Sequence, residues 1–229
     1  MSAAMTTDVT AGLARLLDER YSCRAFLPGE VPEVTLRHVL ALAQRTASWC
    51  NTQPWGVHLL SGEATTALAD RLTAHVPTRP PVADLPLPAG YSGVYDARRK
   101  ESGFALYASL GIERGDREAR GAQAMLNYRF FGAPHVAIVT TDREQGTYGA
   151  IDCGGYVATL LLAAQAAGVA AVPQAAIAMA SDAVREHLAL PEDRLVVCAV
   201  ALGLADPDHP ANAFRTTRAD VDEVVTFVR

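Results

Sequence analysis

The longest apolar stretch of the sequence, Tyr148 to Gly168, places the strongest constraint on how the chain folds. Asp152 is its only charged residue. A stretch of this length could span a membrane. However, Gln165 and the pair Gly154-Gly155 interrupt its apolar character, and no cationic flank follows it. We therefore expect a helix buried in a core or in a subunit interface, and no membrane partner.

The composition indicates one globular domain. The chain has 229 residues, of which 50% are hydrophobic and 20% are charged, so it can bury one large core. Its formal net charge of −5 argues against a general nucleic-acid partner, which needs a basic face. We interpret residues 1–229 as a single domain.

The cysteines, the histidines and the N-terminal residues indicate whether the chain binds a metal and where in the cell it works. The four cysteines form no CxxC pair, and the six histidines form no HxxxH or HExxH pattern, so we expect no metal site. The N-terminal MSAAMTTDVT lacks a basic segment followed by an apolar one, which predicts no signal peptide. Free thiols without a disulfide framework favour a cytoplasmic location.

Hydrophobic periodicity predicts helices packed around a few buried strands. Helices are expected at 8–18, from Pro32 onward, and at 63–76, 97–110, 116–131 and 148–168; strands are expected at 55–61, 134–141 and 194–202. Two helices precede the first strand, a pattern typical of an α+β or mixed α/β fold. The prolines crowded into residues 77–90 exclude regular structure there, and we interpret that stretch as an extended excursion, part of a lid over a site.

The cluster Arg20-Tyr21-Ser22-Cys23-Arg24 is the first candidate for chemistry. Alternate residues of an extended segment point the same way, so two guanidinium groups and a hydroxyl could converge on one anion. The planar fork of arginine suits phosphate because it donates two parallel hydrogen bonds. The alternative is a solvated basic turn that pairs with the neighbouring carboxylates. Arg215 and Arg218 in the tail become relevant if they reach the same anion.

A second candidate is the SWCNTQPW loop, residues 48–55, where polar side chains lie between two tryptophans. Its amides and hydroxyls could bind the edge of a planar heterocycle while indole covers apolar faces. The alternative is a helix C-terminus followed by a turn. A thiol nucleophile at Cys50 would need a base such as His58 or His38 close in space.

A third candidate is the loop expected at Gly168 to Ala175, whose small residues let backbone N–H groups approach a ligand closely. An ordinary connection between a helix and a strand is the alternative.

Taken in order, RYSCRAF, SWCNTQPW, GVAAVPQAA and NAFRTTR give the chain a resemblance to the nitroreductase family of FMN-dependent oxidoreductases, over about Leu13 to Val228. The stretches RFFGAPHVAIV and LPEDRLVVCAVALGLADP resemble the branch that acts on nitroaromatic compounds. The resemblance implies an α+β fold, a mixed sheet flanked by helices, in an intertwined homodimer. It also implies FMN at the subunit interface and a C-terminal segment that reaches across to the partner's sheet.

The resemblance also implies roles for particular residues. Arg20, Tyr21, Ser22 and Arg24 match the phosphate-binding segment, and Arg215, or alternatively Arg218, matches a second phosphate ligand. The other matches concern the flavin ring: Asn51 and Gln53 beside it, with Asn51 reaching the partner's flavin, Pro173, Gln174 and Ala175 over it, and Arg99 at its pyrimidine edge. Some family members carry an acidic residue and a glycine where this chain has Gln174 and Ala175, so only the backbone donor near flavin N5 carries over.

The implied reaction is hydride transfer from NADH or NADPH through flavin N5 to a small organic acceptor such as a nitroaromatic compound, in ping-pong order, with no catalytic side chain. The rivals are a flavin enzyme of the same fold with different chemistry (a dehydrogenase, a reductive dehalogenase or a flavin-fragmenting enzyme), a non-catalytic FMN-binding dimer, and a flavin-free thiol hydrolase around Cys50.

Overall fold

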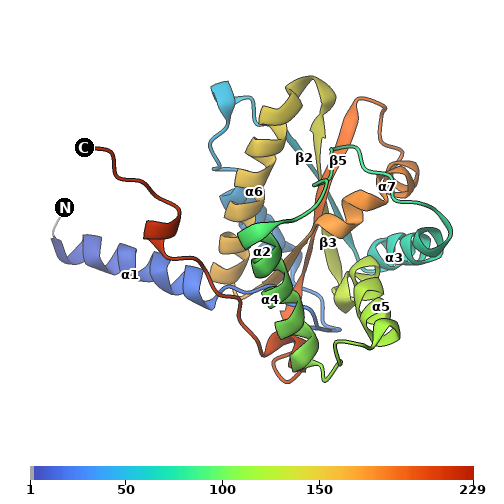
Figure 1. Ribbon diagram of the computed structural model, residues 1–229. Helices are drawn as coiled ribbons and strands as arrows, with labels where there is room; N and C mark the ends of the chain where they lie inside the picture. The colour runs from blue at the N-terminus through green and yellow to red at the C-terminus, as the bar shows by residue number, and fades with distance from the viewer. Residues whose placement is uncertain (1–2) are drawn as a thin grey trace.

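A central antiparallel sheet lies between two layers of helices in the computed structural model (Figure 1), which describes residues 3–229, with side chains from residue 8 onward. The strands are β1 (Phe26–Leu27), β2 (Trp55–Ser61), β3 (His135–Asp142), β4 (Ala170–Gln174) and β5 (Arg194–Ala205). Their order is β1-β5-β3-β2, and β4 also pairs with β5. Among the described strands every pair is antiparallel, and parallel pairing is confined to isolated bridges such as Ser22–Ala171. The α+β prediction is confirmed.

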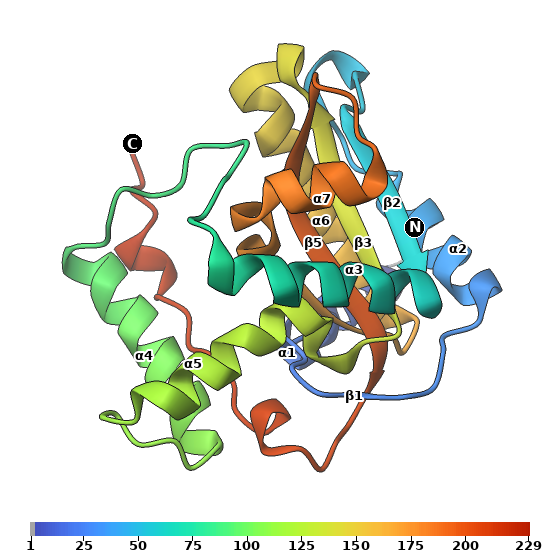
Figure 2. The ribbon, with the colours of Figure 1, turned by 90° about the vertical axis from the view of Figure 1, so that its right-hand side faces the viewer.

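Helices cover both faces of the sheet, as Figure 2 shows. The helices are α1 (Ala3–Glu19), α2 (Glu33–Ala43), α3 (Glu63–His75), α4 (Gly93–Ser109), α5 (Arg117–Met125), α6 (Gly146–Ala166) and α7 (Ser181–Leu188). One core lies between the sheet and α2 and α6, and the other between the sheet and α3 and α7. The site described below lies at the edge of this framework, where the two ends of the chain meet.

One of the two apolar runs of the sequence forms β5, which is covered on both faces. β5 pairs with β1, β3 and β4, and its side chains alternate between the cores: Val196 and Ala199 enter one, Val200 and Leu202 the other. Because β5 is covered on both faces, it has an apolar residue at nearly every position.

The long apolar segment forms α6, as expected, and only one side of it is buried. Cys153, Tyr156 and Leu160 face the core, whereas Tyr148 and Ile151 on the opposite side are exposed. Within the described residues, no helix is long and apolar enough to cross a membrane. The apolar character of α6 therefore serves a core on one side and leaves a second apolar surface uncovered on the other.

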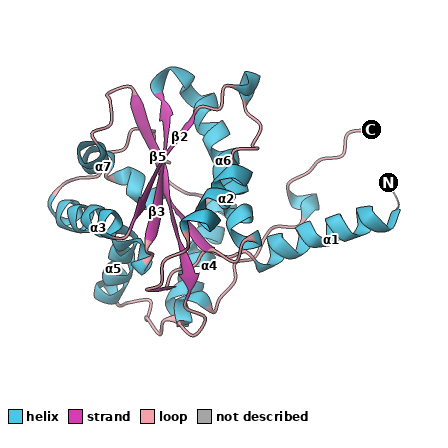
Figure 3. Ribbon diagram, turned by 180° about the vertical axis from the view of Figure 1, so that it is seen from behind, coloured by secondary structure: helices cyan, strands magenta, loops and turns pink. Residues whose placement is uncertain are grey.

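The N-terminal helix and the C-terminal tail extend from the body in the same direction (Figure 3). Val9, Leu13 and Leu17 of α1 are exposed and lie at helical spacing. Val224 and Phe227 of the irregular tail are exposed as well. The expectation about a signal peptide in MSAAMTTDVT includes residues 1–2, which lie outside the described residues. From residue 206 on, the described chain contains no regular structure other than two short 3-10 turns.

The Pro-rich excursion has no helix or strand after its 3-10 turn at Val76–Thr78, as predicted. Its middle is attached to the body. The backbone N–H of Val82 donates to the Met179 carbonyl at 2.9 Å, and the carboxylate of Asp84 accepts from the Val196 N–H at 2.8 Å. The segment then passes directly into α4.

Three expectations about local structure were wrong. The stretch expected as a loop at 168–175 contains β4, because its backbone pairs with β5 and its small apolar side chains enter the two cores. The helix expected at 116–131 ends at Met125 and continues as a 3-10 segment with positive φ at Phe130 and Phe131. Helix α7 was missed. In each case tertiary packing decided the local conformation.

Candidate functional site

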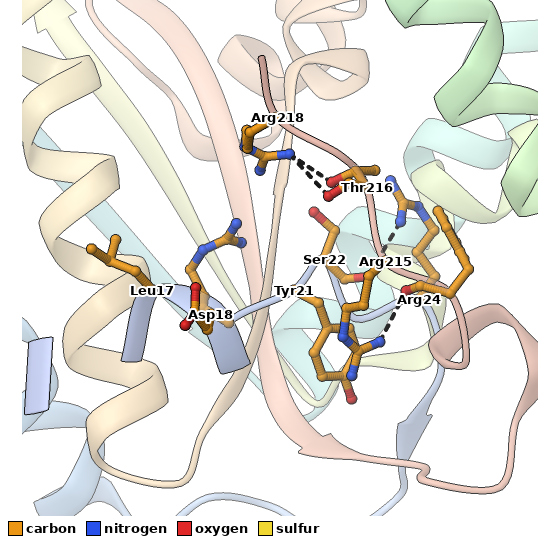
Figure 4. A pocket seen from close by; sticks show the side chains of 10 residues that line it. Leu17, Asp18, Tyr21, Ser22, Arg24, Arg215, Thr216 and Arg218 are labelled. Carbon is orange, nitrogen blue, oxygen red and sulfur yellow. Dashed lines mark hydrogen bonds between the residues drawn. The ribbon is translucent and has the colours of Figure 1, made fainter. Parts of the chain in front are cut away.

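A cationic pocket forms where the N-terminal segment meets the C-terminal tail (Figure 4). It encloses about 190 Å³. Its lining comes from residues 17–24 and 214–218: Leu17, Asp18, Arg20, Tyr21, Ser22, Arg24, Phe214, Arg215, Thr216 and Arg218. The structure thus brings together all the residues expected to bind a phosphate, including both alternatives in the tail.

Backbone pairing with the sheet holds the N-terminal half of the pocket. Ser22 forms a parallel bridge with Ala171 of β4, and the Cys23 N–H donates to the Ala171 carbonyl at 3.1 Å. Because the segment is extended, the Cys23 side chain is fully buried while its neighbours Ser22 and Arg24 line the pocket. Burial raises the pKa of the Cys23 thiol. The alternation expected from the sequence holds for Ser22, Cys23 and Arg24, whereas Tyr21, at an intervening position, also lines the pocket.

Asn212 joins the two halves of the pocket. This buried side chain accepts from the Arg24 backbone N–H at 2.8 Å and donates to the carbonyls of Ala25 at 2.9 Å and Asp206 at 2.8 Å. A buried amide with three such partners is well satisfied and fixes the start of the tail against residues 24–25. The sequence analysis missed this role, although Asn212 begins the NAFRTTR motif on which the resemblance rests.

The tail arginines are held by backbone oxygens and by an aromatic ring. The guanidinium of Arg215 lies 3.9 Å from the centroid of the Tyr21 ring and donates to the Asn212 and Phe214 carbonyls, each at 2.9 Å. Arg218 donates to the Thr216 hydroxyl at 2.8 Å and to the Thr217 carbonyl at 2.7 Å. These contacts use only some of the five N–H donors of each guanidinium, so others stay free for a ligand.

The charges of the pocket are not neutralised within the described chain. Arg20, Arg24, Arg215 and Arg218 form no ion pair with a described carboxylate, although Asp18 lies on the pocket wall. Burial first and then the charge of Arg218 lower the pKa of Arg20, and burial lowers that of Arg24. Four unpaired cations at one pocket repel one another. A bound dianion would relieve that repulsion, and the residues present therefore fit the phosphate of FMN.

A larger pocket of about 740 Å³ adjoins the cationic pocket and shares Arg215, Thr216 and Arg218 with it. Its other walls are residues 94–105 of α4 and the end of the tail. This volume is within the range usual for small-molecule sites. The Pro-rich excursion leads into α4, but none of its residues lines either pocket, so its role as a lid stays a prediction.

Asn51 and Gln53 lie apart from the cationic pocket. Both are exposed and have positive φ values, 58° and 48°, and the Gln53 amide donates to the Asn51 carbonyl at 3.2 Å. Trp49 packs edge-on against Tyr148 of α6, with ring centroids 4.2 Å apart, and the Trp49 backbone N–H donates to the Asp152 carboxylate at 3.1 Å. The loop is thereby fixed to the start of α6, beside the exposed apolar side of that helix.

The residues expected over the flavin ring lie at the end of β4. Pro173 and Ala175 are exposed, whereas Gln174 is buried and its amide donates to the Asn127 carbonyl at 2.8 Å. Its side-chain oxygen has no hydrogen-bond partner among the described residues. Gln174 therefore points into the protein, which agrees with the expectation that only the backbone of this stretch faces a ligand.

Arg99 does not join either group. Its guanidinium pairs with Asp96 at 3.0 Å, one turn earlier on α4, and lies 5.3 Å from the Tyr91 ring centroid. The neighbouring Arg98 lines the larger pocket instead and pairs with Glu223 of the tail at 3.2 Å. Arg99 lines neither of the two pockets, and its predicted place at the pyrimidine edge of the flavin ring stays a prediction.

Comparisons with known proteins agree with the geometry. The model of the Nitroreductase family matches residues 17–204. The chain is 39% identical to a nitroreductase NfnB from Mycolicibacterium smegmatis over 98% of this chain and 96% of that protein. It is 38% identical to a 4-nitrobenzoate reductase from a Nocardioides species, over 91% of this chain and 87% of that protein.

A solved structure shows that the similarity to nitroreductases extends to the fold. The crystal structure of the FMN-dependent nitroreductase NfnB from Mycobacterium smegmatis in complex with NADPH aligns with a TM-score of 0.91 at 38% identity. The alignment covers 96% of this chain and 100% of that one. The likeness thus includes both chain ends that build the cationic pocket.

Proposed function

Because the chain belongs to the nitroreductase family, we propose that it is an FMN-dependent oxidoreductase that uses NADPH or NADH to reduce a small nitroaromatic acceptor. The observation that carries this proposal is the cationic pocket. Arginines from both ends of the chain meet there without carboxylate partners, as binding of a phosphate dianion requires.

In this proposal the pocket holds the FMN phosphate. Arg20, Arg24, Arg215 and Arg218 donate charge-assisted hydrogen bonds, and Ser22 adds a hydroxyl. Tyr21 stabilises the grip by stacking under Arg215. Both tail arginines line the pocket, so both are assigned to the phosphate.

The remaining predicted residues would surround the flavin ring. Asn51 and Gln53 offer amide groups to its edge, the backbone of Pro173, Gln174 and Ala175 faces it, and Arg99 supplies a positive charge at the pyrimidine side. When bound, FMN supplies the redox chemistry, taking two electrons from the nicotinamide and passing them to the acceptor. The chain then needs to orient the reactants and exclude water, and no side chain acts as acid, base or nucleophile.

We also propose that the working unit is a homodimer with FMN at the subunit interface. Two observations support it: the exposed apolar side of α6 and the exposed apolar residues of α1 and the tail are the kind of surface that an obligate dimer buries. The SWCNTQPW loop lies beside that side of α6, where a second copy could reach it. The cytoplasm is the proposed location, in agreement with four free cysteines.

The test begins with the purified protein and its spectrum. We expect bound FMN, bleaching under anaerobic titration with NADPH or NADH, and rapid acceptor-dependent oxidation with 4-nitrobenzoate or nitrobenzene. Parallel titrations with the two nicotinamides compare them directly. Absence of colour and of flavin uptake on adding FMN would refute the proposal. Bleaching without turnover of any nitroarene would favour a flavin enzyme of different chemistry, and binding without bleaching a non-catalytic dimer.

Complementation tests the shared site. One variant carries Arg20→Ala and Arg215→Ala, and the other Asn51→Ala and Gln53→Ala. If each site combines arginines of one chain with the loop of the other, mixed dimers contain one intact site, and an equal mixture refolded or co-expressed together regains about a quarter of the wild-type sites. A mixture no more active than the mean of the two variants would exclude the shared arrangement.

A further inference from the structure

The end of the chain is held in place by few contacts. After residue 212 the tail contains no regular structure except the short turn Val221–Glu223. An irregular segment keeps one conformation only where side-chain or backbone contacts outweigh the conformational entropy that it loses. Asn212 fixes where the tail starts, but Arg218 lies six residues further on and needs support of its own.

That support comes from α4. The Thr217 hydroxyl donates to the Glu101 carboxylate at 2.9 Å, and Arg98 pairs with Glu223 at 3.2 Å. We call these two contacts the α4–tail clasp. They join one face of the helix to the tail on either side of Ala219.

The clasp lies directly next to a phosphate-pocket residue. Arg218 donates to the carbonyl of Thr217, the residue whose hydroxyl is held by Glu101. The charge of Arg218 lowers the pKa of Arg20, so the two guanidinium groups lie close enough to repel each other. Without an attachment at Thr217, this repulsion would favour conformations of the tail that carry Arg218 away from the pocket.

Helix α4 lies at the periphery of the chain, and none of its residues is buried in the described structure. Besides the tail, its second half contacts the segment that follows it, where Arg114 lies over the Phe104 ring and Arg120 over the Tyr107 ring. Its first half follows the Pro-rich excursion, which is joined to the body at Val82 and Asp84. The tail and α4 therefore stabilise each other, and a shift of either one moves a wall of the larger pocket as well as Arg218.

We propose that Glu101 and Thr217 are positioning residues for the phosphate grip, acting through Arg218, and that the α4–tail clasp couples phosphate binding to the wall of the larger pocket. The inference rests on the proposed function, since it takes the cationic pocket to be the FMN phosphate site. Coupling of this kind is reciprocal: a bound phosphate that holds Arg218 also holds α4 in place.

The central experiment measures FMN affinity in a double-mutant cycle. Thr217→Val removes the hydroxyl and leaves the charge and shape of the tail unchanged. We expect FMN to bind about three- to tenfold more weakly, the size of one ordinary hydrogen bond, because this bond is exposed to solvent. In the Arg218→Ala background the same substitution should have almost no effect, because Arg218 is the residue through which the clasp acts. Equal effects in both backgrounds would overturn the proposal.

Glu101→Ala separates the clasp from simple electrostatics. Removing a negative charge near four arginines would by charge alone strengthen phosphate binding, whereas loss of the clasp weakens it. We therefore expect weaker FMN binding. The matched control is Glu118→Ala on α5, an exposed carboxylate with no side-chain partner among the described residues, which should change FMN affinity less than twofold. Tighter binding in Glu101→Ala would overturn the proposal.

The ion pair of the clasp allows a charge swap. Arg98→Glu and Glu223→Arg should each weaken FMN binding by up to about fivefold, the upper range for an exposed pair, and the double variant should regain most of the loss. Riboflavin, which lacks the phosphate, should bind all of these variants as it binds the wild type. Equal loss of FMN and riboflavin would show a general structural defect and refute the clasp. If the wild type itself bound FMN no better than riboflavin, the phosphate pocket and the proposed function would fail first.

Discussion

The cationic pocket and the SWCNTQPW loop differ in whether the residues of a single chain are enough to form a binding site. The pocket is assembled from both ends of one polypeptide, fastened by Asn212 and by the bridge between Ser22 and β4. The loop is held by the contacts of Trp49 and Asp152, and its exposed residues Asn51 and Gln53 line neither of the two pockets described above. In the proposed homodimer, one chain supplies the charged groups for the phosphate, and the partner chain supplies the loop that contacts the flavin ring.

The largest expected effect is on the pocket side of this comparison. Arg20→Ala combined with Arg215→Ala should weaken FMN binding by on the order of 10³-fold, because each arginine contributes a charge-assisted hydrogen bond. Fluorescence titration with FMN measures it, with Arg15→Ala on exposed α1 as the control. An effect below about tenfold would mean that the arginines do not hold the phosphate.

Thiol labelling compares the two regions directly, since each contains a cysteine. Cys50 in the loop is exposed, whereas Cys23 beneath the pocket is fully buried and has a pKa raised by burial. We expect Cys50 to react at least about 100-fold faster than Cys23 at pH 8. Because a raised pKa keeps Cys23 a thiol at higher pH than usual, a change from pH 7 to pH 8 should leave its labelling slow. Mass spectrometry of the labelled peptides resolves the two sites, and rapid labelling of Cys23 would show that the pocket segment is not held on β4.

A smaller effect is expected from the loop amides. Asn51→Ala should lower turnover with a nitroarene by about tenfold while changing FMN affinity less than the arginine variants do, because it removes one hydrogen bond at the ring and none at the phosphate. Steady-state kinetics and FMN titration on the same preparation separate these two quantities. Loss of FMN affinity as large as that of the arginine pair would remove the distinction between the two regions.

The smallest effect is that of salt. Raising the ionic strength from about 0.05 M to about 0.5 M should weaken FMN binding a few-fold, because it screens the pocket arginines. Riboflavin binding, which depends on the ring and not on the phosphate, should hardly change. Equal salt sensitivity of the two ligands would place the charge recognition elsewhere.

Local pattern was sufficient for much of the fold. The alternation from Trp55 to Ser61 and the apolar runs of β5 and α6 identified elements whose burial follows from their own residues. The pattern was insufficient at residues 168–175, where small side chains suit a loop and a strand equally, and at Phe130 and Phe131, where packing imposes positive φ. Local preference is a weak guide wherever pairing with a distant strand decides the conformation.

The amino-acid sequence by itself determined which groups can bind a phosphate: the arginine, serine and arginine at alternate positions 20, 22 and 24, and the tail arginines 215 and 218. Only the tertiary structure decided that they share one pocket, that Asn212 and the α4–tail clasp hold it together, and that Asn51 and Gln53 lie outside it. The physical reason is the distance along the sequence over which each effect acts. The direction of a side chain follows from neighbouring residues, whereas the meeting of segments almost 200 positions apart depends on the sheet between them.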